Sequence, residues 1–206
     1  YSEHPEYRLH SDPEEYRTSD NPFLFAVQTH LRSQVRHARP FNWAIPAVRA
    51  HKFAFIKEIC ETCDIDGFEM DFMRHPDLFR PEETTREERE GIMTAFVSQV
   101  RKVLDASAKP GQTRYLAIRL PNQIVQYDAM GVNLEAITAA GVDMITLSCN
   151  YNTTQFFDVA KARERLTDTA IYAEFAFMTH HYRRKGQRRG ERRLLTAEQM
   201  RTTAQL

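Results

Sequence analysis

The segment IDGFEMDFMRHPDLF, residues 65–79, decides the fold class, because it has the alternating apolar pattern of a strand. Three acids, Asp66, Glu69 and Asp71, interrupt this pattern. A buried carboxylate costs several kcal/mol unless it is paired or hydrogen-bonded. The acids therefore indicate either a structural ion-pair network or a chemical site.

Helical patterns flank this strand on both sides. PAVRAHKFAFIKEICETC (46–63) has apolar residues at helical spacing and Pro46 near its start. RPEETTREEREGIMTAFVSQVRKVLDASAKPG (80–111) opens with two overlapping capping boxes ahead of an apolar stripe. The remaining patterns predict strands at 114–121, 142–150 and 170–178, and helices at 133–141, at 156–166 and from Thr196 onward.

Strict alternation of helices and strands predicts an α/β fold with a parallel sheet. The (β/α)8 barrel and the open doubly wound sheet both satisfy it. The barrel is favoured, because the chain lacks the glycine-rich turn of a nucleotide-binding doubly wound sheet. Only about four good strands are found, whereas a barrel has eight, so we expect part of a barrel. Residues 1–42 are then a long irregular barrel loop or N-terminal segment, and 43–206 the barrel portion of a single domain.

The charge balance gives no support for nucleic acid or a membrane as partner. Lys and Arg together number 28, as do Asp and Glu, so the formal net charge is zero. No apolar run approaches the roughly 18 residues of a membrane span, and the N-terminus lacks the layout of a secretory signal. The segment HHYRRKGQRRGERR (180–193) is basic; it fits a solvated loop or, at a barrel mouth, a rim for an anionic polysaccharide.

Three cysteines are too few for a disulfide framework. Cys60 and Cys63 form a C-x-x-C, but they continue the helical apolar period, and no second Cys/His pair follows at zinc spacing. We expect two small residues facing the core. No metal site and no cofactor is predicted.

In a barrel, side chains alternate between the interior and the helix layer, and active-site groups lie at the C-terminal ends of the strands. This alternation directs Phe68, Met70 and Phe72 to the helices. Glu69 and Asp71 then share the inward face, with Asp71 nearer the mouth. We expect Asp71 to be the catalytic acid and Glu69 an orienting neighbour.

Other strand ends offer polar groups for the same site. Glu174 interrupts the apolar strand IYAEFAF and, opposite Asp71, would complete the pair of carboxyls that glycosidases use. A separation of about 5–5.5 Å predicts retention of configuration, and about 6.5–9.5 Å predicts inversion. For Glu69 and Asp71, a salt bridge from Arg74 or Arg119 is the purely structural alternative. The candidates for substrate binding are Arg74, His75, Arg119, Asn150 and Tyr151.

The segment NWAIPAVRAHKFAFIKEICETCDIDGFEMDFMRHPDLF (42–79) resembles the bacterial glycoside hydrolase family 10-like glycosidases, whose fourth barrel strand commonly reads D-[VI]-D-G-[IL]-E-[LF]-D-F-M-R. AIRLPNQIVQYDAMGVNLEAITAAGVDMITLS (117–148) is similar to the next strand, helix and strand of that family. The resemblance implies a carbohydrate-active barrel, of which this chain spans about strands four to seven. It also implies Asp71 as the acid of strand four and a periplasmic or secreted location.

The combined expectation is a glycoside hydrolase that cleaves a polysaccharide or oligosaccharide with paired carboxyls and no cofactor. The alternative is a non-catalytic glycan-binding module or a degenerate barrel. Family 18 chitinases carry D-G-x-D-x-D-x-E on the corresponding strand, and Met73 stands where that motif ends in Glu. Their substrate-assisted mechanism therefore does not transfer to this chain.

Overall fold

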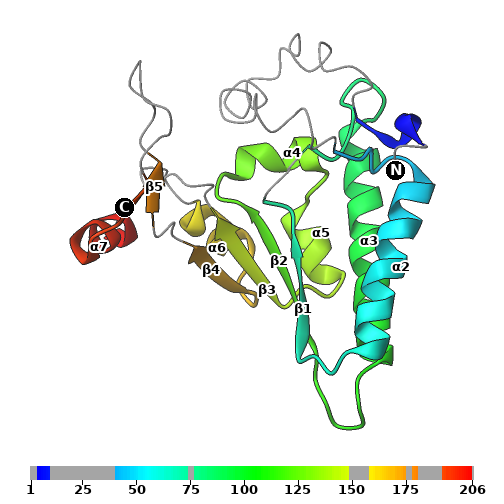
Figure 1. Ribbon diagram of the computed structural model, residues 1–206. Coiled ribbons are helices and arrows are strands. Elements are labelled where there is room, and N and C mark those ends of the chain that lie inside the picture. The colour runs from blue at the N-terminus through cyan, green and yellow to red at the C-terminus, as the bar shows by residue number, and fades with distance from the viewer. Residues whose placement is uncertain are drawn as a thin grey trace.

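The protein is seen here in a computed structural model that describes residues 4–9, 40–73, 77–148, 158–174, 178–180 and 192–205. A parallel sheet of four strands, in the order β1-β2-β3-β4, forms its centre (Figure 1). The strands are β1 (Gly67–Asp71), β2 (Tyr115–Pro121), β3 (Met144–Ser148), β4 (Ala170–Glu174), β5 (Met178–His180) and β6 (Arg192–Leu194). The helices are η1 (Pro5–Tyr7), α2 (Pro46–Thr62), α3 (Arg86–Ala106), η3 (Ile124–Gln126), α4 (Tyr127–Met130), α5 (Leu134–Ala139), α6 (Val159–Arg165) and α7 (Ala197–Gln205).

The expected α/β fold with a parallel sheet is confirmed. Each strand of the central sheet pairs with the next one along the chain, and a helix stands in every connection between them. Of the predicted strand at 170–178, the structure shows β4 at Ala170–Glu174 and the start of β5 at Met178, while residues 175–177 lie outside the described part. The strict alternation is wrong after β4, since β5 and β6 pair antiparallel in a separate sheet.

The two long helices begin where the sequence predicts. In α2, Pro46 occupies the first turn, where a missing N–H costs nothing. In α3, Thr85 is the cap rather than Thr84: its hydroxyl accepts from the Glu88 N–H at 3.2 Å, and the Glu88 carboxylate accepts from the Thr85 N–H at 2.7 Å. This is a complete capping box, and it fixes the start of the longest helix.

The helix-facing side of the sheet is the hydrophobic core. Met70 and Phe72 of the first strand segment are buried there, and Phe68 packs against them, as the alternation predicts. The apolar stripe of α3 covers this side with Met93, Phe96, Val97, Val100 and Leu104. Cys60 joins the core, but Cys63 is exposed, so the expectation that both cysteines face the core is wrong for Cys63. The reason is that α2 ends at Thr62, and the residue after it leaves the helical period.

The opposite side of the sheet, called the open face below, carries the other half of the alternation. It consists of Glu69, Asp71, Tyr115, Ala117, Arg119, Met144, Thr146, Ser148, Ala170, Tyr172 and Glu174. Tyr115 and Tyr172 are 51% and 54% exposed, so no described helix buries this face. Parallel sheets are normally covered on both sides.

The connection after β2 contains structure that the sequence patterns did not predict. PNQIVQYDAM folds into η3 and the short helix α4, which are anchored by the buried Tyr127 hydroxyl donating to the Pro121 carbonyl at 2.7 Å. Gly131 ends α4 in the left-handed region at φ 68°, where glycine is favoured. The connection thereby holds the C-terminal end of β2 in place.

Candidate active site

Arg119 links both predicted acids at the C-terminal end of the open face. Its Nη1 donates to Asp71 Oδ2 at 2.9 Å. Its Nε and Nη2 donate to Glu174 Oε2 and Oε1 at 2.5 and 2.8 Å, a two-point ion pair. Nη2 also donates to Ser148 Oγ at 3.0 Å. A single guanidinium thus contacts side chains from β1, β3 and β4.

The strand register explains this convergence. Asp71 and Arg119 are direct register partners on β1 and β2, so their side chains stand next to each other on one face. Glu174 is the register partner of Ser148. Both lie two residues nearer the C-terminal end of the sheet than the row that contains Asp71 and Arg119. Strands lie about 4.8 Å apart, so the Arg119 side chain has to cross β3 to reach Glu174. Ser148 lies beneath this crossing and accepts one of its hydrogen bonds.

Both carboxylates remain accessible to solvent. The side chains of Asp71 and Glu174 are 42% and 43% exposed, against 26% for Arg119. Asp71 is additionally fixed by the Met73 N–H, which donates to its Oδ1 at 2.8 Å. Because Asp71 and Glu174 hydrogen-bond to the same small planar group, their nearest oxygens lie within about 8 Å of each other. This upper limit admits the carboxyl separations of both retaining and inverting glycosidases.

The electrostatics of the cluster keep Arg119 charged. Burial of the guanidinium lowers its pKa, but the hydrogen bond and charge of Glu174 and the charge of Asp71 outweigh burial, so the pKa of Arg119 rises above its ordinary value. The cluster therefore combines one permanent cation with two carboxylates.

Glu69 lies on the open face two residues before Asp71, beside Ala117 on β2. It is exposed, and no hydrogen bond or ion pair connects it with another residue in the described part of the chain. The structure thus brings Asp71, Arg119 and Glu174 together and leaves Glu69 outside their cluster.

The other predicted substrate-binding residues cannot be placed. Arg74, His75, Asn150 and Tyr151 lie outside the described residues, as does most of the basic segment 180–193. Their proposed roles remain predictions from the sequence.

Two residues of the open face were missed by the sequence reasoning. Ser148 contacts Arg119 directly, and Tyr172 stands in the same register row as Asp71 and Arg119. The alternation that selected Glu174 contains the signal for Tyr172, which lies two residues earlier on the same strand. For Ser148, the signal is its position two residues before Asn150 in the predicted strand 142–150.

Neither a metal centre nor a membrane helix is found in the described ranges. No three side chains of His, Cys, Asp or Glu there form a group that could hold a metal ion. Among the described helices, none combines the length and apolarity needed to cross a bilayer.

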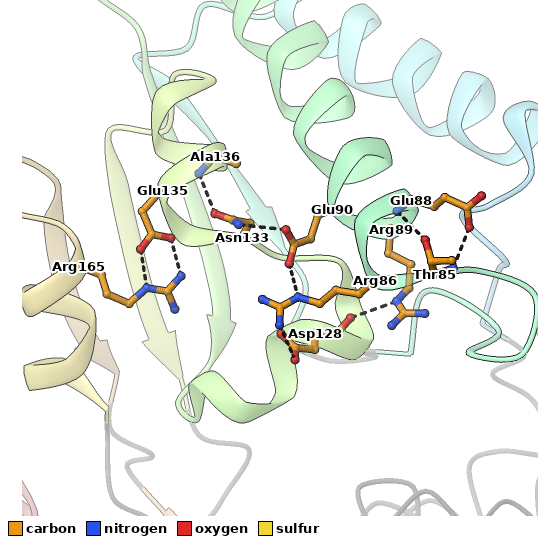
Figure 2. A network of polar contacts seen from close by, with 10 residues as sticks. All are labelled: Thr85, Arg86, Glu88, Arg89, Glu90, Asp128, Asn133, Glu135, Ala136 and Arg165. Carbon is orange, nitrogen blue, oxygen red and sulfur yellow. Dashed lines mark hydrogen bonds and ion pairs between the residues drawn. The ribbon is translucent and has the colours of Figure 1, made fainter.

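A second polar cluster lies in the helix layer (Figure 2). Arg86 of α3 pairs with Glu90 at 2.7 Å and with Asp128 of α4 at 3.2 Å, and Asn133 donates to Glu90 at 3.0 Å. Beside it, Arg165 of α6 forms a two-point ion pair with Glu135 of α5. These contacts join consecutive connections of the fold, so their role is structural.

Comparisons with known proteins add no relative. The sequence matches no protein-family model, and a search of curated proteins finds no significant match.

Proposed function

We propose that the protein is a glycoside hydrolase, with Asp71 and Glu174 as its pair of carboxyls. The observation that supports this most is that both acids lie on one face, at one end of the sheet, on either side of Arg119. An upper limit of about 8 Å between their nearest oxygens is compatible with the carboxyl separations that glycosidic bond cleavage uses.

The same proposal includes a (β/α) barrel, of which the central sheet is an arc. Three features support it: the strands follow one another in chain order, helices α2 to α6 cover one face, and no described helix covers the other face. A doubly wound sheet reverses its strand order and has helices on both faces. In a barrel, the open face would be the interior, and its C-terminal end, with Asp71 and Glu174, would be the mouth.

In the proposed reaction, one carboxyl protonates the oxygen of the leaving sugar, while the other attacks the anomeric carbon or activates water. Asp71 and Glu174 fill these two roles. Glu69, Tyr172 and the predicted contacts Arg74, His75, Asn150 and Tyr151 would surround the sugar. The substrate is a polysaccharide or oligosaccharide, and no cofactor takes part.

A non-catalytic glycan-binding module is the second candidate. The observation that favours it is the ion pairing itself, because Arg119 engages both acids as it would in a purely structural network. In this case, the open face would bind sugars through Tyr172 and the hydrogen-bonding groups around it.

The two candidates separate when hydrolysis and binding are measured on the same variants. We expect the protein to release reducing ends from at least one member of a panel of neutral, uronate-containing and amino-sugar polysaccharides. Asp71→Asn and Glu174→Gln should each abolish release while retaining binding in affinity electrophoresis. Glu58→Gln, an exposed acid on α2, is the control and should behave as the wild type.

The outcomes are distinct. Normal hydrolysis by both site variants would show that the catalytic assignment is wrong. Binding without hydrolysis by the wild type would support the binding module. A wild type that neither binds nor cleaves any member of the panel contradicts both candidates.

A further inference from the structure

Arg119 is engaged almost completely by protein groups. A guanidinium has five N–H donors. Arg119 makes four hydrogen bonds within the described residues: two to Glu174, one to Asp71 and one to Ser148. A side chain bound in this way is held in one orientation by three strands.

We infer that Arg119 is a positioning residue, which fixes the separation and orientation of Asp71 and Glu174, rather than the substrate-binding residue that its place on the strand predicts. The inference rests on the proposed function, since it assigns a role relative to the two acids. It adds that the distance between them is set by a side chain and not by the sheet alone.

The charge balance argues against direct substrate binding by Arg119. Its positive charge is already matched by Asp71 and Glu174, the carboxyls to which it hydrogen-bonds. A uronate or sulfate that approached Arg119 would also come close to these two acids. Anion recognition by this arginine is therefore unfavourable.

The geometry argues for positioning. Asp71 and Glu174 stand on strands β1 and β4, which are separated by two others, and each is about two-fifths exposed. The Met73 N–H holds Asp71 from within its own strand segment, whereas Arg119 contacts both carboxyls. The planar fork of Arg119 binds Glu174 at two points and Asp71 at a third, which restricts both carboxyls together. A displacement of about 1 Å in a reacting group can cost about 100-fold in rate.

Lysine cannot replace this function. Its ammonium is a compact charge without the fixed fork of the guanidinium, so it can neutralise the acids but cannot hold both in defined directions. Arg119→Lys should therefore retain part of the fold's stability and lose most of the positioning.

The test compares kcat and KM of Arg119→Ala and Arg119→Lys on the polysaccharide that the wild type cleaves. We expect Arg119→Ala to lower kcat by about 100-fold and to change KM by less than about threefold. Added guanidinium chloride at low millimolar concentration should restore part of the activity of Arg119→Ala and none of that of Asp71→Asn. Arg119→Lys should fall between wild type and Arg119→Ala and should not respond to guanidinium.

Arg86→Ala provides a matched control. Arg86 also contacts two carboxylates, but in the helix layer, so its loss should leave kcat within about twofold of wild type. Circular dichroism and thermal unfolding establish that each variant is folded. If Arg119→Ala does not fold, Arg119→Lys decides alone, by a fall in kcat at unchanged KM.

Two results would overturn the inference: a rise in KM at unchanged kcat, which identifies a substrate contact, or unchanged kcat and KM. In both, wild-type hydrolysis that is abolished by Asp71→Asn and Glu174→Gln shows that the proposed function still holds. Absence of wild-type hydrolysis is instead a failure of the proposed function, and the positioning role fails with it.

Discussion

Arg119 and Glu174 form a two-point ion pair across the intervening strand β3, although 55 residues separate them in the chain. Nε and Nη2 of the arginine each donate to a different oxygen of the carboxylate, at 2.5 and 2.8 Å. This pairing links β2 to β4 at the end of the sheet where the candidate site lies.

The strength of that ion pair is measurable without a substrate. A double-mutant cycle with Arg119→Met, Glu174→Gln and the double variant should give a coupling free energy of about 1 kcal/mol, because partial exposure screens the pair. The measurement is urea unfolding at pH 7. A coupling indistinguishable from zero would mean that solvent competes successfully for both partners.

The helix-layer cluster of Figure 2 should make stability fall in acid. The hydrogen bond from Arg86 and then that from Asn133 hold the pKa of Glu90 below its ordinary value of 4.5. The hydrogen bond from Arg165 lowers the pKa of Glu135 likewise. The stability they contribute is thus fully present above about pH 4.5 and is lost as the pH falls through their lower folded-state pKa values.

Urea titrations between pH 7 and pH 3 measure this dependence. Glu90→Gln should reduce the unfolding free energy at pH 7 by about 1 kcal/mol and make its decline below pH 4.5 shallower than in wild type. Glu58→Gln serves as control and should follow the wild-type curve. Parallel curves for Glu90→Gln and wild type would contradict the assignment.

The Thr85 cap at the start of α3 should contribute about 1 kcal/mol to the unfolding free energy. Thr85→Ala removes the hydroxyl that accepts from the Glu88 N–H and leaves that donor without its cap. Thermal unfolding should show the loss, and Thr85→Ser should restore most of it, because serine has an equivalent hydroxyl. An alanine variant as stable as wild type would mean that water replaces the cap at no cost.

Two glycines give a matched pair of substitutions. A Cβ on Gly67 would lie 2.5 Å from the Tyr115 carbonyl oxygen on the neighbouring strand, so Gly67→Ala should destabilise the protein by about 1–3 kcal/mol. A Cβ on Gly91 within α3 meets nothing within 4 Å, so Gly91→Ala should stabilise it by about 0.5–1 kcal/mol. Equal effects in urea unfolding would refute the close approach at Gly67.

The sequence patterns predicted the helices and strands better than the contacts between their side chains. Alternation in β1 correctly separated Met70 and Phe72 from Glu69 and Asp71, because a strand reverses the side chain direction at each residue. The ion pair of Arg119 with Asp71 was one of the alternatives that the sequence left open. Its contact with Glu174 was beyond reach, since it depends on the register between strands far apart in the chain. Periodicity also gave no sign of α4, which is too short for a helical repeat to develop.

The exposure of Cys63 shows the same limit at a helix end. An apolar period can be followed along α2, but the residue at which the helix stops depends on the fold around it. For the antiparallel pair β5 and β6, three residues per strand are too few to give an alternating pattern.

The arrangement of Asp71, Arg119 and Glu174 on three strands also has a consequence for folding kinetics. A slip of one residue in any strand would turn its charged group toward the apolar helix layer, where it would lose its partners. Their contacts are non-local, and contacts between distant segments form late and slow the search for the native state. The three charges therefore come together only when the sheet is complete and correctly aligned, so assembly of the site depends on formation of the whole sheet.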